Sequence, residues 1–277
     1  MAAQGSLGLD PSPNLGENVR YEILGSLRIR QDDCDQRSST VNAHNMEVVL
    51  AALLVRADEV VSIPQLSHEV WGEHPPKRYL AAIHVYISRL RKLLSREDVP
   101  GNPIVTRSPG YMLQLGEDRL DAKEFQRLMR EGRQAARANR PETAAAGFEA
   151  ALDLWRGPAL GDLRAGPILD GFVGWAEEAR LECVGMHVEA GLTLGRHQEL
   201  VGQLYSLTSE HPLHEGFRRQ LMIALYRSER QADALRVYGS TRRTLNIELG
   251  IEPGRALRDV HRAILLSDRS LDLATAA

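Results

Sequence analysis

The stretch KRYLAAIHVYISRLRKLLSR, residues 77–96, decides how the first half of the sequence is interpreted. Its apolar residues recur at alternating spacings of three and four, which is the spacing of an α-helix with one buried face. That face is expected to carry Leu80, Ile83, Ile87, Leu90 and Leu94. No acidic residue lies between Lys77 and Arg96. The free face of the helix is therefore expected to be basic.

At about 100° per residue, the side opposite the apolar residues carries Arg78, Val85, Arg89, Lys92 and Arg96. A helix that is only solvated usually mixes charge signs, because residues four apart can then form ion pairs. This helix does not mix them, and Val85 adds an apolar side chain in the middle of the exposed face. These features favour a surface for the major groove of double-stranded DNA over an ordinary solvated face.

The chemistry of each side chain suggests a role. Arg89 is the first candidate for a base contact, because a guanidinium can bond to guanine O6 and N7, and Val85 can touch a thymine methyl. His84 and Ser88, on the flanks, are candidates for either bases or phosphates. The remaining cations are candidates for phosphates, with an ion pair to the second domain as the alternative, above all for Arg91. These cations are Lys77, Arg78, Arg91, Lys92 and Arg96.

Short elements precede the basic helix. The pattern predicts strands at residues 19–24 and 27–30 and a helix at residues 45–56. Ser62-Ile-Pro-Gln65 is a capping-box sequence, so a short helix should start there and run to about Trp71.

A hairpin is expected after the basic helix, with strands at residues 104–107 and 111–115 joined by Ser108-Pro-Gly110. Strands, three helices and a hairpin in this order are typical of a winged helix-turn-helix. Arg107, at the tip of the hairpin, could then enter a neighbouring minor groove.

The second half of the sequence has a different pattern. Asp121-Ala-Lys-Glu124 resembles a capping signal, and almost everything beyond it is helical, so the domain boundary is expected near residues 116–120. Arg140, Arg196 and Arg230 each fall in a short turn between helices, and the last two are 34 residues apart, one tetratricopeptide period. The small residues and the aromatic residue that fit such helix pairs are Gly132, Ala144, Phe148 and Ala151. An ordinary helical bundle is the alternative.

Composition sets the broad class of the protein. A hydrophobic fraction of 43% and a net charge of −3 in 277 residues are those of a globular protein without an overall basic surface. We expect a mostly α-helical protein with a flexible N-terminal tail at residues 1–18, a winged helix at residues 19–115, an all-α, tetratricopeptide-like domain at residues 121–267 and a C-terminal tail at residues 268–277. No segment resembles a signal peptide or a membrane span, so a cytoplasmic location is expected.

The motifs of several other function classes are missing from the sequence. Cys34 and Cys183 are far apart and lack metal-ligand spacing, and no phosphate-binding loop occurs, so no metal or cofactor is expected. The best material for an enzyme is a group of histidines and glutamates without a recognisable catalytic spacing. The group comprises His187, His197, His211, His214, Glu182, Glu189 and Glu210.

Several runs of residues together resemble one known family, the Streptomyces antibiotic regulatory proteins. In the first half these runs are residues 59–66, 70–72, 75–76, 86–94 and 105–111. They are similar to the winged helix of OmpR-type response regulators. In the second half, residues 154–160, 194–197, 210–213, 220–228 and 248–253 resemble the family's bacterial transcriptional activation domain.

The resemblance implies an activator of gene clusters for antibiotics and other secondary metabolites. Family members bind direct repeats near the promoter −35 element as head-to-tail dimers, and recruit RNA polymerase through its sigma factor and other subunits. The DNA-facing helix would correspond to residues 77–94 and the wing to residues 107–111, which adds Tyr111 to the candidate contacts. Residues 77–82 are bulkier and more charged than is usual in the family, so a base preference is not carried over.

Two other functions remain open at this point. A repressor could be built from the same parts, because the sequence indicates DNA binding more directly than its outcome. A protein-protein adaptor could use the helical repeats alone, and would then show no salt-sensitive binding to DNA.

Overall fold

The computed structural model describes residues 18–31, 44–95, 101–163, 166–268 and 271–272. Arg96, Cys34 and most of the two expected tails lie outside these residues. The chain forms two compact units, one of residues 1–124 and 155–177, the other of residues 125–154 and 178–277. The expected boundary at residues 116–120 does not coincide with this division, because residues 155–177 belong to the first unit.

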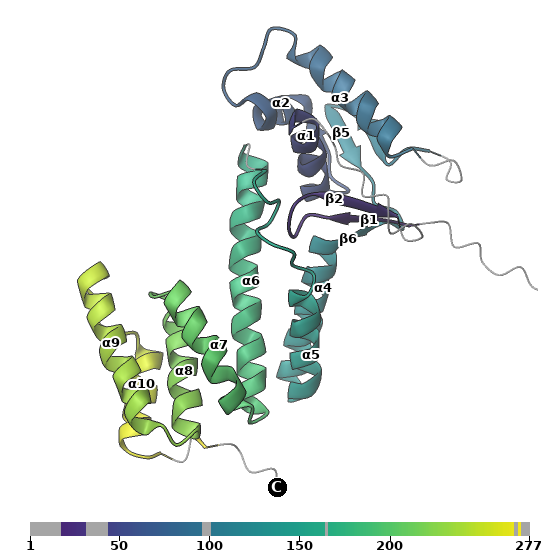
Figure 1. Cartoon of the computed structure of the whole chain (residues 1–277). Helices are drawn as coiled ribbons and strands as arrows, with labels where there is room; N and C mark the ends of the chain where they lie inside the picture. Colours follow the sequence, from purple (N-terminus) through teal and green to yellow (C-terminus); the bar gives the residue numbers. More distant parts are fainter. Residues whose placement is uncertain (1–17, 32–43, 96–100, 164–165, 269–270, 273–277) are drawn as a thin grey trace, which may run out of the picture. The chain divides into compact units, whose positions relative to one another are not determined.

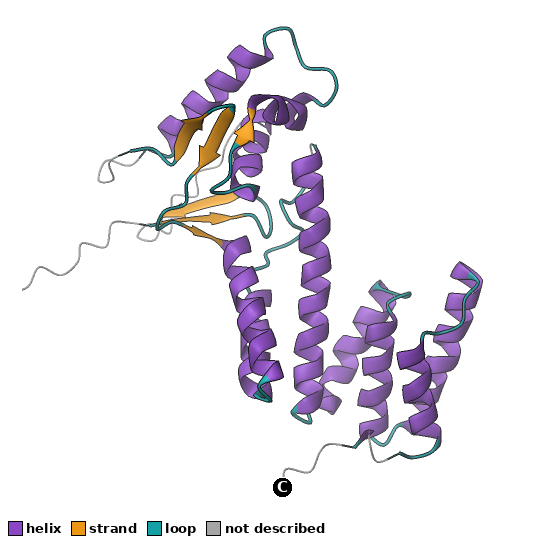
Figure 2. Cartoon of the chain, turned by 180° about the vertical axis from the view of Figure 1, so that it is seen from behind, coloured by secondary structure: helices purple, strands orange, loops and turns teal. Residues whose placement is uncertain are grey.

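Two small sheets occur in the first unit, drawn as orange arrows in Figure 2. In one sheet β1 (Val19–Glu22) pairs antiparallel with β2 (Arg28–Gln31) and parallel with β6 (Arg119–Leu120). In the other, β5 (Gly110–Leu113) lies between β3 (Val61–Ser62) and β4 (Ile104–Arg107), antiparallel to both. Neither β3 nor β6 was expected, because two residues are too few to show an alternating pattern.

Three helices pack together beside these sheets, α1 (His44–Val55), α2 (Ile63–Trp71) and α3 (Tyr79–Leu93) (Figure 1). The expected capping box is confirmed: the Ser62 hydroxyl accepts the Gln65 amide N–H, and the Gln65 side chain accepts the Ser62 amide N–H. In the order of its elements this unit is the winged helix-turn-helix that the sequence predicts.

The basic helix is shorter than the sequence suggested, and its buried face begins later. It starts at Tyr79 and ends at Leu93, and Leu80 is 47% exposed where burial was expected. Leu80 lies in the first turn, ahead of Ile83, the first residue of α3 that is fully covered. The expectation of a buried Leu80 was therefore wrong.

A buried carboxylate connects the first sheet to the helices that follow it. Asp121, at the start of α4 (Asp121–Arg137), accepts hydrogen bonds of 2.9 Å from the backbone amides of Ile23 and Leu24, directly after β1. Burial raises the pKa of this carboxyl, and the amides together with Arg156, 3.7 Å away, oppose that rise. The sequence suggested a local cap for α4, but Asp121 bonds to backbone almost a hundred residues away.

Residues 155–177, which belong to the first unit, bond to the same backbone directly after β1 and to α2. The amides of Arg156 and Leu160 donate to the carbonyls of Leu24 and Ile23. The buried Glu69 carboxylate of α2 accepts the amides of Ile168 and Leu169 in the first turn of α6 (Pro167–Thr193). A negative charge at a helix N-terminus is favourable, because the unpaired amide N–H groups there point toward it.

The second unit is built of helices joined by tight turns. After α4 they are α5 (Pro141–Leu152), α6, α7 (His197–Glu210), α8 (Glu215–Arg227), α9 (Gln231–Leu249) and α10 (Arg255–Leu265). Arg140, Arg196 and Arg230 fall in turns as expected. Each follows a residue with positive φ, and each donates its amide to a carbonyl five residues earlier, which is the Schellman cap of the preceding helix.

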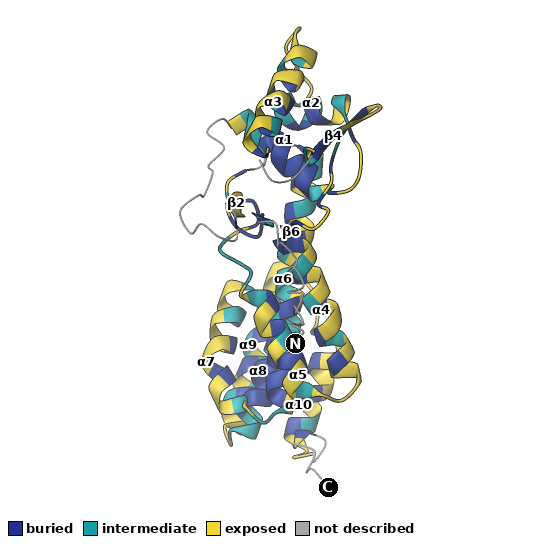
Figure 3. Cartoon of the chain, turned by 90° about the vertical axis from the view of Figure 1, so that its right-hand side faces the viewer, coloured by how far each residue is buried: buried dark blue, intermediate teal, exposed yellow. Residues whose placement is uncertain are grey.

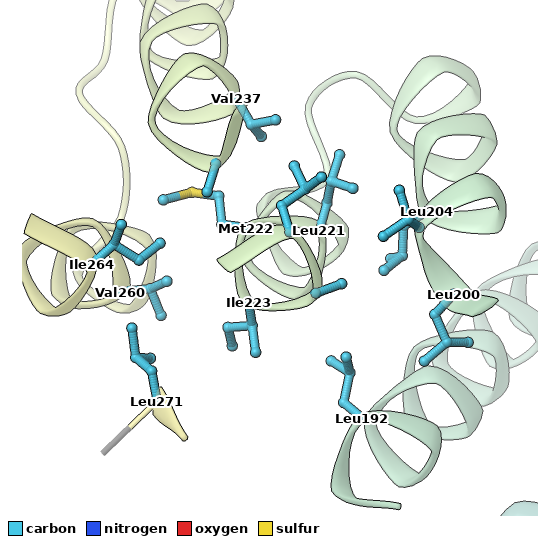
Figure 4. Close-up of a cluster of buried hydrophobic side chains, with 14 of the residues drawn as sticks. Leu192, Leu200, Leu204, Leu221, Met222, Ile223, Val237, Val260, Ile264 and Leu271 are labelled. Atoms are coloured by element: carbon cyan, nitrogen blue, oxygen red, sulfur yellow. The ribbon is translucent and has the colours of Figure 1, made fainter. Parts of the chain in front are cut away.

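Close packing of small against large residues fills the helical unit. A Cβ atom on Gly132 of α4 would lie 2.6 Å from the Phe148 ring of α5, so only glycine fits there. Further along, side chains of α7, α8, α9 and α10 form one apolar cluster (Figure 4), in which Leu221 and Met222 of α8 are fully buried. The expected pairing of small and aromatic residues is thus observed between α4 and α5.

We predict that Asp121→Ala lowers the free energy of unfolding by about 3 kcal/mol, because it leaves two buried amides without an acceptor. Urea unfolding followed by circular dichroism measures the change. Asp162→Ala, which removes an exposed carboxylate of the same unit, is the control and should change stability by less than about 0.5 kcal/mol. Equal stability of the two variants would contradict the role of Asp121.

Candidate nucleic-acid interface

One side of α3 carries exposed residues (yellow in Figure 3). His84, Val85, Ser88, Arg89 and Lys92 are all exposed on it, and Val85 keeps 46% of its surface accessible. Ala81, one turn before Val85, is also exposed and leaves room for close approach of a partner. Helix α3 therefore presents a mixed cationic and apolar surface, with its small residue near the start.

The opposite side of α3 fixes the helix in place. Ile83, Ile87 and Leu90 are buried against α1 and α2. Tyr86 stacks on Trp71 of α2 with 6.2 Å between ring centroids, and its hydroxyl accepts a 3.2 Å hydrogen bond from the Asn45 side chain of α1. From the sequence, Tyr86 was noted only as the first residue of a run that resembles the family. In the structure it helps to position α3 against α1 and α2.

Arg91 connects α3 to the hairpin instead of extending into solvent. Its Nε donates to the Ile104 carbonyl and one terminal nitrogen donates to Thr106 Oγ1, both at 2.9 Å. Its guanidinium also lies over the Tyr111 ring, 5.7 Å from the centroid. The alternative that the sequence left open for Arg91, an ion pair with the second domain, is replaced by bonds within its own unit.

Tyr111 belongs to the same support. It is only 7% exposed and lies in β5 under the Arg91 guanidinium. These contacts give Tyr111 and Arg91 a role in supporting the hairpin, and their expected contacts with DNA stay a prediction. The sequence could not separate them from their exposed neighbours, because both lie within motifs that also contain exposed residues.

The hairpin between β4 and β5 places Arg107 at an exposed tip. Gly110, just after the turn, lies so close to β3 that an added Cβ would be 1.9 Å from the Val61 carbonyl oxygen. The glycine therefore lets the hairpin pair with β3, next to the start of α2. Thr106 and Ser108 are exposed beside Arg107 and extend the polar tip beyond the single residue that the sequence singled out.

The cations of this surface have no acidic partner among the described residues. In the described part of the chain no carboxylate pairs with Arg89, Lys92 or Arg107, and Lys77 and Arg78 are exposed just before α3 begins. Unpaired charges on one face are costly to bring together and are favoured where phosphates supply the counter-charge. Arg96 was expected to join this set but lies outside the described residues.

The histidines and glutamates considered for catalysis have structural roles where the structure describes contacts. The His214 ring accepts the Phe217 amide at the start of α8, and the His187 ring lies 3.3 Å from the Ala145 carbonyl. Glu189 pairs with Arg219 at 2.8 Å. Among the described residues, no group of three potential ligands could hold a metal ion. No helix that the structure describes is long and apolar enough to cross a membrane.

Comparison with known proteins matches both halves of the chain. Residues 31–113 match the family described as "Transcriptional regulatory protein, C terminal", and residues 120–265 match the "Bacterial transcriptional activator domain". Regulatory protein DnrI of Streptomyces peucetius is 37% identical over 241 residues, which cover 85% of this chain and 89% of DnrI. The chain belongs to the Streptomyces antibiotic regulatory protein family.

Two further relatives extend this result. Transcriptional regulator RedD of Streptomyces coelicolor is 34% identical over 266 residues, which cover 95% of this chain and 75% of RedD. The solved structure of Mycobacterium tuberculosis EmbR in complex with a low affinity phosphopeptide has a TM-score of 0.85 and 32% identity, and the match covers 91% of this chain and 66% of that one. The expected fold of a winged helix followed by a helical domain is confirmed for this Streptomyces antibiotic regulatory protein.

We predict that Arg89→Ala impairs base recognition without changing stability, whereas Arg91→Ala lowers stability. Arg89→Ala should leave the melting temperature unchanged and reduce discrimination between bases by about 1–3 kcal/mol. Arg91→Ala should lower the free energy of unfolding by about 2 kcal/mol, because it removes two hydrogen bonds and the ring contact.

Gel shifts with DNA selected from a random pool, together with thermal melts, measure both effects. Sequence-selective binding that survives Arg89→Ala would refute its role as a base contact. A melting temperature unchanged by Arg91→Ala would refute the positioning role.

Proposed function

We propose that this transcriptional regulator is an activator that binds direct repeats near the −35 element of promoters in a secondary-metabolite gene cluster. Two protomers bind head to tail, and the complex recruits RNA polymerase through its sigma factor. The observation that carries DNA binding is the unpaired cationic face of α3 with Val85 at its centre, beside the exposed Arg107. The antibiotic-pathway regulators among the relatives support the choice of target genes.

In this proposal the contact residues divide by chemistry. Arg89, Val85 and the flanking His84 and Ser88 face the bases, because they occupy the middle of the exposed side of α3. The phosphate contacts are made by cations at the edges of that side, which fix register without reading sequence. These are Lys77, Arg78 and Lys92, with Arg107 in the minor groove and Arg96 as a further candidate.

Activation is distinguished from repression by transcription with purified components. On a template that carries the selected repeats upstream of a weak promoter, we expect the protein to increase the yield of transcript severalfold, and Arg89→Ala to abolish the increase. A decrease in transcript with the wild-type chain would identify a repressor. An unchanged yield despite full occupancy of the repeats would contradict polymerase recruitment.

Salt dependence separates a DNA-binding protein from an adaptor. The logarithm of the DNA-binding constant should fall linearly with the logarithm of the salt concentration. Each lost phosphate contact reduces the steepness of this line by about 0.9. We predict that Lys92→Ala weakens binding to all DNA sequences alike and lowers the slope by about one such step. Fluorescence anisotropy at several salt concentrations measures this slope. A slope that Lys92→Ala leaves unchanged would remove Lys92 from the phosphate contacts.

A further inference from the structure

A groove within the second unit is lined by arginines from two sides. It is an open groove of about 720 Å³ between α7, α8 and α9. Leu221 and Val237, which also belong to the apolar cluster of Figure 4, form part of its lining, together with Tyr205. Its charged lining consists of Arg218, Arg230, Asp233, Arg236 and Arg243. Nothing in the DNA-binding role of α3 uses this groove.

Three arginines follow one another at similar intervals along α9. Arg230 precedes the helix, and Arg236 and Arg243 follow at intervals of six and seven residues on the side that faces the groove. At about 1.5 Å per residue these positions are roughly 10 Å apart and span about 20 Å. Between them, a Cβ on Gly239 would meet no atom within 4 Å, so the middle of the groove is open.

The arginines differ in how far they are already paired. Asp233 accepts hydrogen bonds from both Arg230 and Arg236, which fixes these two and neutralises them in part. Arg243 is exposed, and no carboxylate in the described chain is paired with it. Arg218 donates from one terminal nitrogen to the Thr208 and Pro212 carbonyls.

Arg218 also carries an unsatisfied donor. Its Nε is buried and has no hydrogen-bond partner among the described residues. A buried N–H without an acceptor costs free energy, but this atom is covered by the fold, so Arg218 offers the groove its charge and not this donor.

The spacing of charge selects among anionic ligands. A compact polyphosphate concentrates its charge in one place and cannot contact arginines spread over about 20 Å. Single-stranded nucleic acid usually stacks its bases on several aromatic rings, and Tyr205 is the one aromatic side chain in the described lining. An extended peptide advances about 3.3 Å per residue, so acidic residues three apart match the arginine spacing, with apolar side chains between them over Leu221 and Val237.

We propose that this groove binds an extended acidic segment of a partner protein, with carboxylates on Arg230, Arg236 and Arg243. The inference is independent of the proposed promoter architecture, because it rests on the second unit alone. Bidentate guanidinium–carboxylate pairs give such a site geometric specificity as well as charge.

The test is fluorescence anisotropy with the full chain and labelled peptides of about eight residues, long enough to span the arginines. The peptides carry Asp or Glu at every third position and varied apolar residues between. We expect some of these peptides to bind. Arg243→Ala and Gly239→Tyr should weaken their binding about tenfold or more, by loss of a charged hydrogen bond and by filling the groove. Arg262→Ala, which removes an exposed arginine of α10 outside the groove, is the control and should have no effect.

The same variants, with tripolyphosphate and oligothymidylate as competitors, distinguish a peptide from other possible ligands of the groove. Circular dichroism first establishes that Gly239→Tyr retains its helix content, and Arg243→Ala should bind selected DNA as the wild type does. The proposal is overturned if no acidic peptide binds, or if binding survives both groove variants. It is also overturned if Arg89→Ala abolishes peptide binding, or if tripolyphosphate or oligothymidylate binds the groove in place of the peptides.

Discussion

The buried carboxylate of Asp121 is the interaction on which the arrangement of the first unit depends. It holds the backbone directly after β1, before the turn to β2, and it lies at the start of α4, where the chain enters the helices. The same stretch of backbone offers its carbonyls to Arg156 and Leu160. A winged helix cut off before Asp121 would therefore lose acceptors for two buried amides and donors for two carbonyls.

This dependence explains why the compact unit is larger than the DNA-binding domain that the sequence suggested. Glu69 of α2 caps α6, and α2 is also the helix against which Tyr86 of α3 stacks. Helix α3 is thus linked through α2 to residues 155–177, far along the chain. Gly166 permits this contact, because a Cβ there would lie 2.8 Å from the Glu69 Cα atom.

Features whose cause is local could be predicted from the sequence, and features whose cause is distant could not. The capping box of Ser62 and Gln65 needs only residues three apart, and it forms as expected. Asp121 has the same local appearance, but its carboxylate bonds to distant amides, for which the sequence carries no signal. The periodicity of α3 located Ile83, Ile87 and Leu90 in the core but not the exposure of Leu80, because a helix can extend beyond the surface that it packs on.

The distinction between local and distant causes also applies to the candidate site. Exposure of Arg89 and Val85 follows from helical periodicity alone, whereas the use of Arg91 depends on where β4 and Tyr111 lie. Two arginines separated by one residue thus have unrelated roles, one toward solvent and one within the fold.

The two cationic surfaces of the chain differ in a way that bears on their ligands. On α3 the cations lie on a convex helix and have no acidic partner in the part of the chain that the structure describes, an arrangement suited to a wide groove that supplies phosphates on both sides. In the groove of the second unit Asp233 already holds two of four arginines, which lowers the attraction for a dense polyanion and leaves directed donors. Such donors favour separate carboxylates, each met at its own position. Net charge alone, at −3, reveals neither surface, because both depend on local segregation of charge.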